Sequence, residues 1–379
     1  MKTNACVIIS FVLFFFGCQQ DTVNPDSGQD NTKPGAPKVI TLNSAKNAGS
    51  TNGRILYRKP NGLVVRTSAG QLKLFPFRNN TFYGNGGGQV VGSGYSYQNY
   101  LPADWNNDGK TDLVLKDNNH SLWFAPFNNG SFALQPGDVG VGFSQPALAV
   151  GEWWTPSGFP AGDPDTPDLV GFWSTGATTI YPFKSHKSSG FGTFKNGGSY
   201  NAGITESGYT THYLLADWSG DGLHDIIARN SLGHLNYYKY DGNTYSFVHQ
   251  GLVGHGFFFT DYFITDREKD GKADGLLVRD NNGLLKLFNF NSTFYNQPCN
   301  GYVIGSGFHY TDYFVGEWAG GSNFDIIGRD SAGDMYLHRS TFACQPSSQC
   351  QCPPSNAYPY FRVKIGHGWF FDKYFMGTW

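Results

Sequence analysis

The chain contains 379 residues, with 50 Gly, 32 Phe, 22 Tyr and 9 Trp, and only 15% of its residues are charged. A chain of this length can bury a large core, and its many Gly and aromatic residues favour short strands joined by tight turns over long helices. The formal net charge of −2 supplies no basic face, so the composition argues against nucleic acid as a partner.

The N-terminal segment predicts export. Lys2 precedes an almost unbroken apolar run over residues 7–17. Such a run is too short to span a bilayer, but it suits the core of a signal peptide. Because it ends directly before Cys18, it resembles a bacterial lipoprotein signal, in which that Cys is lipidated. We therefore expect residues 1–17 to be a signal peptide and the protein to be an exported lipoprotein of the cell envelope, at the outer membrane or the cell surface. Ordinary secretion is the alternative.

Residues 18–52 are expected to form a flexible tether. Beyond Cys18 the segment has no aromatic residue, and Asn, Asp, Ser, Gly, Thr and Pro dominate it. A segment with so little apolar surface cannot offset the entropy that it would lose on ordering. The folded part is therefore expected to begin near residue 53.

From residue 53 onward the sequence repeats itself with a period of about 50 residues. Three landmarks recur: a strand that ends in an acid and Trp, such as Asp104-Trp105; two strands across a tight turn, as in residues 63–72; and a Gly-aromatic pair, such as Gly94-Tyr95. Apolar runs on both sides of an Asn/Ser/Gly turn indicate a β-hairpin. Six copies of about four strands each predict an all-β fold, a six-bladed β-propeller over residues 53–379.

The ends of the repeat region predict how the ring closes. The last copy stops at Trp379, where its hairpin would be needed, and the missing hairpin lies at residues 63–72. We expect a C-terminal strand at about residues 374–379 to complete the blade that the N-terminal strands begin, because this pairing removes the open sheet edges. An extra short strand at residues 55–58 leaves a seven-bladed ring as the alternative.

Three copies contain an acidic loop with the outline Asp-x-Asn-x-Asp-Gly-x-x-x-Asp, starting at Asp104, Asp217 and Asp266. Oxygen ligands at alternate positions of a tight loop can converge on one hard cation, and the Gly permits the turn. The equivalent segments after Glu152 and Glu317 depart from this outline, so we expect no metal there.

The loop and the strand after it, as in residues 216–229, resemble the FG-GAP/VCBS repeats of integrin alpha-chain propellers and bacterial surface proteins. The resemblance covers about residues 53–379. It implies Ca²⁺ held by loop positions one, three, five and nine, and a mainly structural role for the metal. The implied ligands are Asp104, Asn106, Asp108 and Asp112; Asp217, Ser219, Asp221 and Asp225; and Asp266, Glu268, Asp270 and Asp274. The alternative is an Asx-rich turn that only satisfies its own backbone.

Catalysis is not expected. The carboxyl groups suited to acid–base work occupy one repeated position, which favours a structural role; they are Asp104, Glu152, Asp217, Asp266 and Glu317. The sequence has no Gly-x-Ser-x-Gly elbow and no metal-binding His spacing. It therefore predicts a non-catalytic binding or adhesion module of the cell envelope, with an enzyme acting on polysaccharide as a less favoured alternative.

Aromatic residues near the Gly-aromatic turns are candidates for stacking on carbohydrate. The candidates are Tyr97, Tyr100, Tyr213, Tyr262, Tyr310, Tyr313 and Trp369. For each of them the alternative is packing in the core between blades. Adhesion to an extracellular or envelope protein, or an assembly scaffold, is the competing function, with the divergent inserts at 154–167 and 184–200 as its expected contact sites.

The remaining cysteines predict disulfide bonds. They are Cys299, Cys344, Cys350 and Cys352. An even number in an exported chain favours disulfides, and three pairings stay open. A zinc site is less favoured, because the crowded pair Cys350 and Cys352 has no His nearby.

Overall fold

The computed structural model describes residues 38–41, 60–83, 87–153, 166–186, 191–194, 199–204, 210–266, 271–294, 301–319, 324–339 and 362–379. The chain divides into two units, residues 1–34 and 35–379, and every described residue belongs to the second. The described residues form strands and turns, and none of them provides a helix long and apolar enough to cross a membrane.

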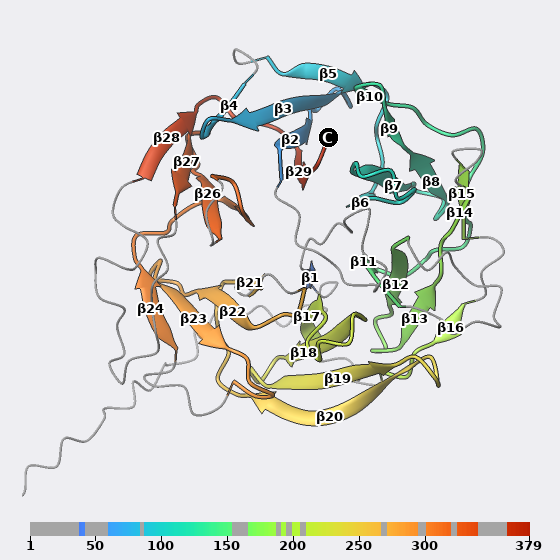
Figure 1. Cartoon of the computed structure of the whole chain (residues 1–379), viewed down its shortest axis with the longest axis vertical. Coiled ribbons are helices and arrows are strands. Elements are labelled where there is room, and N and C mark those ends of the chain that lie inside the picture. The colour runs from blue at the N-terminus through green and yellow to red at the C-terminus, as the bar shows by residue number, and fades with distance from the viewer. Residues whose placement is uncertain are drawn as a thin grey trace, which may run out of the picture. The chain divides into compact units, whose positions relative to one another are not determined.

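Six small antiparallel sheets are arranged as blades around a central axis (Figure 1). This arrangement confirms the predicted six-bladed β-propeller. Each blade is numbered here in chain order, and its innermost strand lies nearest the axis. The region of residues 55–58, on which the seven-bladed alternative depended, lies outside the described residues.

Blade 1 joins the two ends of the repeat region. It contains β29 (Lys373–Gly377), β2 (Gly62–Arg66), β3 (Leu72–Arg78), β4 (Thr81–Phe82) and β5 (Gln89–Gly92). β29 pairs with β2 in an antiparallel register that sets Leu63 opposite Met376 and Val65 opposite Tyr374. The expected closure of the ring by a C-terminal strand is therefore confirmed, and it removes two open sheet edges.

The other blades follow along the chain. Blade 2 contains β6 (Asn99–Ala103), β7 (Asp112–Lys116) and β8 (Leu122–Ala125), beside a small hairpin of β9 (Phe127–Asn128) and β10 (Ser131–Phe132). Blade 3 contains β11 (Ala147–Gly151), β12 (Asp168–Phe172), β13 (Thr178–Tyr181) and β16 (Tyr200–Asn201), with a hairpin of β14 (Lys184–His186) and β15 (Phe191–Thr193).

Blades 4 to 6 are regular four-stranded sheets. Blade 4 contains β17 (Thr210–Ala216), β18 (Asp225–Asn230), β19 (Leu235–Asp241) and β20 (Ser246–Gly254). Blade 5 contains β21 (Asp261–Thr265), β22 (Gly275–Arg279), β23 (Leu285–Asn289) and β24 (Tyr302–Gly305). Blade 6 contains β25 (Asp312–Gly316), β26 (Asp325–Arg329), β27 (Met335–His338) and β28 (Arg362–Gly366).

Blade 2 is the exception to the four-stranded pattern. In place of a regular outer strand, the segment after β10 is held to β8 by backbone hydrogen bonds of Gln135 and Val139 and by a single bridge between Leu122 and Gly140. The outer edge of blade 2 is therefore less regular than that of its neighbours.

The second strand of each blade is buried along almost its whole length. β7 (DLVLK) and β12 (DLVGF) are buried at every position, and β2, β22 and β26 at every position but the last. A strand covered by neighbouring blades on both faces has no solvent side, so it appears in the sequence as a run of apolar residues without alternation.

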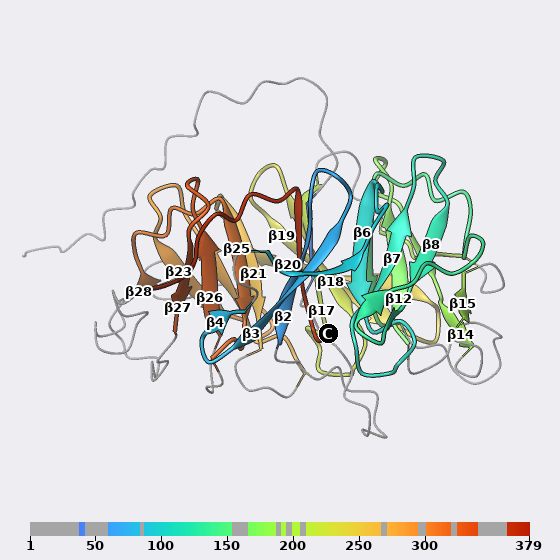
Figure 2. The same cartoon turned by 90° about the horizontal axis from the view of Figure 1, so that it is seen from above.

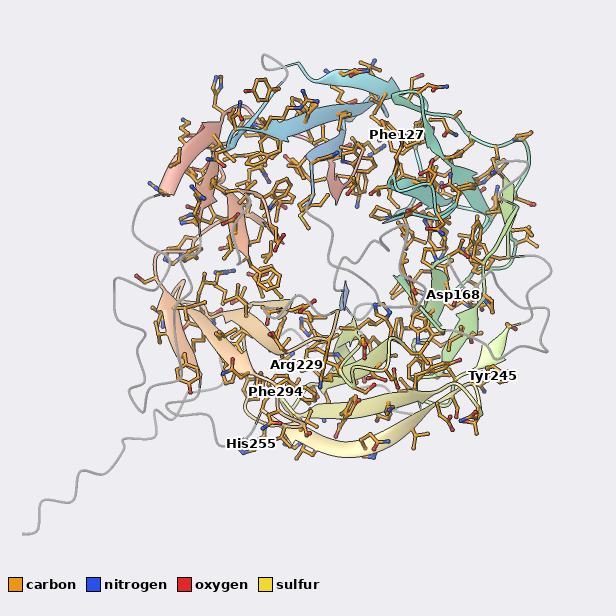
Figure 3. The ribbon with its side chains drawn as sticks, in the orientation of Figure 1. Phe127, Asp168, Arg229, Tyr245, His255 and Phe294 are labelled. Carbon is orange, nitrogen blue, oxygen red and sulfur yellow. The ribbon has the colours of Figure 1, made fainter. Side chains whose placement is uncertain are left out.

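The core lies between blades and is largely aromatic. The Trp residues that follow the acids, Trp105, Trp153, Trp218 and Trp318, are each at most 1% exposed. Figure 3 shows side chains filling the spaces between neighbouring sheets, with Phe127 in the space between blades 1 and 2. There Phe127 meets Phe132 at 5.0 Å between ring centroids and Trp379 at 5.8 Å. The last residue of the chain is thus part of the core contact that closes the ring.

The tether prediction is wrong for four residues. Lys38–Thr41 form β1, which pairs in parallel with the innermost strand of blade 4, with Lys38 opposite His212 and Thr41 opposite Leu215. The segment as a whole is polar, but Val39, Ile40 and Thr41 are β-branched residues that favour strands. It is ordered because the inner edge of β17 offers backbone donors and acceptors to any extended segment that reaches it.

The ring has two faces with different turns, and Figure 2 shows the strands running between them. Since the strands of a blade alternate in direction, the acidic loops that follow the innermost strands all lie on one face, which we call the acidic-loop face (residues 104–112 and 217–225). The Gly-aromatic turns between blades lie on the opposite face, which we call the glycine face (residues 94–95, 142–143, 256–257, 307–308 and 368–369).

Candidate functional site

The first acidic loop is closed by its own backbone. Asp104 accepts hydrogen bonds from the backbone N–H of Asp108 at 3.0 Å and of Gly109 at 2.9 Å, and Asp108 accepts one from Lys110 at 2.8 Å. Asn106 accepts a further bond from the N–H of Asp108 at 3.0 Å. These bonds hold the carboxylates at alternate positions of one tight turn, as the spacing predicts.

Asp112 ends this loop in a buried position. Its side chain is 0% exposed, and Oδ1 accepts the N–H of Phe127 at 2.8 Å, whereas Oδ2 has no hydrogen-bond partner among the described residues. Burial raises the pKa of Asp112 well above its ordinary value and the carboxyl groups of Asp108 and Asp104 raise it further, whereas the backbone N–H groups of Phe127 and Asn106 lower it. A buried carboxylate oxygen without a donor is the chemistry that a hard cation would satisfy.

The second loop has the same outline but different partners. Asp225 accepts hydrogen bonds from Ser219 N–H, from the hydroxyl of Tyr237 and from Tyr240 N–H, each at 2.9 Å. Nζ of Lys239 lies 3.0 Å from Oδ2 of Asp221. This loop therefore carries a positive charge and a phenol donor that belong to the protein itself.

Equivalent positions show why the first loop lacks these partners. The N–H groups of Phe127 and Tyr240 make the same bond, each to the Asp that lies 15 residues earlier. Phe127 and Tyr240 are therefore equivalent positions. Three residues before them, Phe124 corresponds to Tyr237, and one residue before them, Pro126 corresponds to Lys239. The oxygen donor set of the first loop thus fits Ca²⁺ better than that of the second, in which an ammonium group already lies beside Asp221.

The third loop is only partly described. Asp266 accepts the N–H of Gly271 at 3.0 Å, and Asp274 accepts the hydroxyl of Thr265 at 3.0 Å. Glu268 and Asp270 lie outside the described residues. Within the described part of the chain, no three His, Cys, Asp or Glu side chains gather in a cluster that could hold a metal ion. Calcium binding therefore stays a proposal.

Blades 3 and 6 use the same acid for backbone contacts. Asp168 accepts N–H groups of Phe183 at 3.0 Å and Trp153 at 3.1 Å, and Asp325 accepts the N–H of Ala319 at 2.7 Å. The terminal Asp of the loop therefore ties the second strand to the rest of its blade even where the other acids are missing.

On the glycine face, each described Gly-aromatic turn has one construction. Gly94, Gly142, Gly256, Gly307 and Gly368 all have φ between +73° and +83°, a region that Gly enters without strain. The next residue points into the core, and its N–H binds the hairpin turn of the preceding blade: Tyr95 to Gly70 O at 2.9 Å, and Phe257 to Gly233 O at 3.0 Å. The glycines thus carry the chain from blade to blade, as the sequence indicates.

A tyrosine six residues after the turn glycine closes four of these turns. The hydroxyl of Tyr313 donates to the carbonyl of Phe308 at 2.8 Å and accepts the N–H of Tyr310 at 2.9 Å. Tyr100, Tyr262 and Tyr374 make the same two bonds in their own turns. We call this arrangement the tyrosine clasp.

An arginine from the preceding blade supports the clasp. The guanidinium carbon of Arg279 lies 5.4 Å from the ring centroid of Tyr313, and that of Arg329 lies 5.3 Å from the ring of Tyr374. Arg279 also pairs with Asp261 at 2.7 Å. These arginines are not among the predicted site residues, although their repeated place at the end of the second strand is visible in the hairpin pattern.

Most of the aromatic candidates for ligand stacking are core residues, which corrects the expectation. Tyr213, Tyr262, Tyr310 and Trp369 are between 1% and 8% exposed, because they fill the space between blades. Tyr100 and Tyr313 are partly exposed, but their hydroxyls are engaged in the clasp. Only Tyr97 of the seven lines one of the described cavities.

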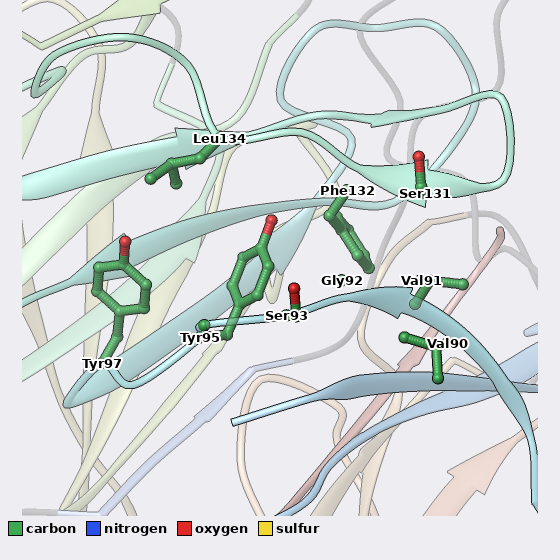
Figure 4. Close-up of a pocket in the computed structure, with 10 residues that line it drawn as sticks. Val90, Val91, Gly92, Ser93, Tyr95, Tyr97, Ser131, Phe132 and Leu134 are labelled. Carbon is green, nitrogen blue, oxygen red and sulfur yellow. The ribbon is translucent and has the colours of Figure 1, made fainter. Parts of the chain in front are cut away.

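The cavity at Tyr97 lies between the outer strand of blade 1 and the irregular segment of blade 2 (Figure 4). It has a volume of about 360 Å³. Apolar side chains, hydroxyl groups and backbone all contribute to its lining; the lining residues are Val90, Val91, Gly92, Ser93, Gly94, Tyr95, Tyr97, Ser131, Phe132 and Leu134. Figure 4 shows the hydroxyls of Tyr95 and Tyr97 on the same side of their turn.

This cavity combines exposed apolar groups with polar ones. Val90 is 52% exposed and Leu134 is 42% exposed, whereas Tyr95 is only 5% exposed and anchors the turn. Burial, followed by the neighbouring hydroxyls of Tyr97 and Tyr100, raises the pKa of Tyr95, so its hydroxyl stays protonated and can donate a hydrogen bond. Aromatic and aliphatic surface beside hydroxyl groups is suited to a ligand that is itself amphipathic.

Several predictions fall on residues that the structure does not describe. The signal peptide at 1–17, the lipidation site Cys18, most of the tether and much of the inserts at 154–167 and 184–200 lie outside the described residues. So do the disulfide candidates Cys299, Cys344, Cys350 and Cys352.

No protein-family model matches the chain, and no curated protein matches it. Among solved structures, the crystal structure of a protein from Lactobacillus plantarum is similar to it, with 13% sequence identity, a TM-score of 0.38 and 80% of each chain covered. The assignment of the fold rests on the sheet topology of the chain itself.

Proposed function

We propose that this protein is a non-catalytic binding module of the bacterial cell envelope and that it recognises carbohydrate. The observation that carries the proposal is the cavity of about 360 Å³ at Tyr97, where an aromatic ring, aliphatic side chains and hydroxyl groups meet at the surface. A pyranose presents C–H groups on its faces and hydroxyls around its edge, so it complements such a lining.

The resemblance to FG-GAP/VCBS repeats supports the same reading. Propellers of that kind occur in adhesins, integrin chains and lectins. The repeated acids support it as well: Asp104, Asp217 and Asp266 each accept hydrogen bonds from the backbone of their own loop, which favours a structural role. Their placement supports a non-catalytic protein over an enzyme acting on polysaccharide.

Calcium belongs to this proposal as a structural ion in the first acidic loop. Asp104, Asp108 and Asp112, with Asn106, would hold it, and bound Ca²⁺ would neutralise the buried carboxylates of Asp104 and Asp112 together with the exposed one of Asp108. The loop lies on the acidic-loop face, opposite the Gly-aromatic turns. The metal would therefore stabilise a blade and would not contact a ligand bound at the Gly-aromatic turns. Export and anchoring through Cys18 complete the proposal.

The test is native gel electrophoresis of the full-length protein through gels that contain yeast mannan, laminarin, xylan or dextran. We expect at least one polysaccharide to retard the protein. Leu134→Asp, which sets a charge at the mouth of the Tyr97 cavity, should abolish this retardation, and Tyr83→Ala should leave it intact because Tyr83 is 45% exposed and does not line the cavity. Equal retardation of Leu134→Asp and the unaltered protein would remove the cavity from the proposal.

Protein adhesion is the competing function. Capture of a defined envelope protein by the full-length chain, together with no retardation in any of the four gels, would favour adhesion over carbohydrate binding.

A further inference from the structure

The second residue after each turn glycine distinguishes one half of the glycine face from the other. At the five described turns this residue is exposed, and its two neighbours in the chain are buried or partly buried. It is Ser96, Ser144, Phe258, His309 or Phe370. Three successive blade junctions, from blade 4 to blade 1, therefore present an aromatic ring where the others present a hydroxyl group.

Each of the three rings lies on a glycine of the preceding hairpin turn. A Cβ atom built on Gly283 would lie 2.7 Å from two ring atoms of His309 and 3.1 Å from a third, and one built on Gly333 would lie 2.7 to 3.1 Å from three ring atoms of Phe370. Similar distances to several atoms of one ring mean that its face, and not its edge, covers the glycine. Phe258 also lies against its glycine, with two ring atoms 2.9 Å from a Cβ built on Gly233.

The outer sides of these rings stay open. Phe258 is 56% exposed and Phe370 is 65% exposed, and His309 is exposed as well. A Phe ring left in water lacks about 1 kcal/mol or more of the free energy that its burial would contribute to folding. Stability alone therefore does not explain an exposed ring at this position. Each ring therefore exposes one side to solvent while its other side rests on the backbone of the glycine in the preceding hairpin turn.

The fold does not need an aromatic ring at this position. Ser96 covers the equivalent glycine in blade 1, with its Oγ 3.2 Å from a Cβ built on Gly70. The backbone bond that sets the turn is also the same: Tyr95 to Gly70 O at 2.9 Å, and Phe308 to Gly283 O at 3.0 Å. A purely structural position would accept Ser at all the turns, so the three rings point to binding.

A polar residue stands three positions before each ring in the chain. The residue before the turn glycine is His255, Ser306 or His367 at these three junctions, and each is exposed. Figure 3 shows His255 at the outer rim of blade 4. The guanidinium carbon of Arg229 lies 5.6 Å from the ring centroid of Phe258. Each ring therefore has hydrogen-bonding groups within three residues of the chain.

We propose that Phe258, His309 and Phe370 are three copies of a carbohydrate-stacking site on the glycine face. The inference rests on the proposed function and extends it to a second, repeated surface. An aromatic face receives the C–H groups of a sugar ring, and the exposed His or Ser three residues earlier supplies hydrogen-bonding groups for its hydroxyls. Because the copies repeat around the ring, they match a polysaccharide with repeating units, which several weak contacts bind more tightly than one.

The test replaces the rings with the residue that other turns carry. Phe258→Ser, His309→Ser and Phe370→Ser are made singly and together, and retardation of the full-length protein is measured in gels of yeast mannan, laminarin, xylan and dextran. Each single change should weaken binding roughly three- to tenfold, and the triple change should abolish retardation. Circular dichroism and thermal melts should stay unchanged, because Ser96 and Ser144 already serve in equivalent turns. Val363→Ser, at a 53% exposed position on the outer strand of blade 6, is the control.

The outcomes separate this inference from the proposed function. Lost retardation in the triple Ser variant with an unaltered melt supports the stacking sites. Retardation that survives in the triple variant but fails in Leu134→Asp overturns them and leaves the cavity at Tyr97 as the binding site. No retardation of the unaltered protein in any gel overturns both.

Discussion

Nζ of Lys239 lies 3.0 Å from Oδ2 of Asp221 in the second acidic loop. At the equivalent place the first loop has Pro126, which carries no charge, and its Asp112 keeps a buried oxygen without a partner among the described residues. Two loops with the same sequence outline are thus neutralised differently, one by an internal ammonium group and one, as we propose, by Ca²⁺.

Lys239→Met is expected to make the second loop depend on calcium. In EDTA the variant should melt about 1–2 °C below the unaltered protein, because both partners are partly exposed and such a pair contributes about 0.2–1 kcal/mol. At one Ca²⁺ concentration the variant should melt at the same temperature as the unaltered protein, since Ca²⁺ in the first loop raises both melting temperatures equally. Lys364→Met is the matched control, since Lys364 pairs with Asp334 at 2.6 Å outside any acidic loop. Recovery in both variants, or in neither, would contradict the assignment.

Asp112→Asn is expected to change the stability of the protein in opposite directions without and with bound Ca²⁺. In EDTA the variant should be more stable than the unaltered protein, because burial raises the pKa of Asp112 and an amide carries no charge to bury. At 1 mM Ca²⁺ the order should reverse, since a site with a Kd of about 10⁻⁴ M contributes about 1.4 kcal/mol. Thermal melts with and without EDTA measure both effects. A calcium-induced shift that is the same in Asp112→Asn would exclude the first loop as the site.

His338 is expected to make the protein sensitive to acid. It is 8% exposed, its Nε2 lies 2.7 Å from the hydroxyl of Tyr310, and burial, followed by the charge of Arg362, lowers its pKa to about 4. Since its folded pKa lies below the ordinary value near 6.5, the stabilisation from neutral His338 is present above pH 6.5 and is lost as the pH falls toward 4.

The loss should reach about 3 kcal/mol at most by pH 4. His338→Gln keeps a hydrogen-bonding side chain but cannot titrate, so its unfolding free energy should fall less between pH 6.5 and 4 when denaturant melts are compared. Buried His224, whose pKa burial also lowers to about 4, acts in the same direction and is left in place in both proteins. Parallel pH profiles for the two proteins would show that His338 contributes nothing.

Tyr313→Phe is expected to weaken the junction between blades 5 and 6. The change removes the hydroxyl that donates to Phe308 O and accepts Tyr310 N–H, which leaves two backbone groups without that partner. The expected loss is about 1–3 kcal/mol in unfolding free energy, measured by denaturant melts. Tyr302→Phe, which removes a hydroxyl outside the clasp, should cost far less; similar losses in the two variants would argue against the clasp.

Much of the fold follows from local pattern. The period near 50 residues and the hairpin signal predicted six blades, with a C-terminal strand completing the blade that the N-terminal strands begin, and β29 does pair with β2. Strand β1 was missed, because the short β-branched run Val39-Ile40-Thr41 stands in a polar segment and its partner, the edge of β17, lies far away in sequence.

The aromatic residues illustrate what local pattern leaves open. Tyr97 and Tyr310 occupy the same position after their turn glycines, yet Tyr97 lines a cavity while Tyr310 is 8% exposed and meets His338 in the core. Phe258 and Phe370 were not among the candidates, although they are the exposed aromatics of these turns. Exposure depends on what the neighbouring blade places against a ring, and that neighbour lies far away in sequence.

By itself, the sequence determined the architecture: the blades, their closure, and the turn glycines whose positive φ carries the chain between sheets. These features are set by short-range periodicity and backbone sterics, which repeat in every copy. The tertiary structure alone decided which acidic loop has Lys239 beside it, which tyrosines hold the clasp, and which rings remain open to solvent. Those outcomes depend on contacts between strands and between blades, where each copy meets different side chains.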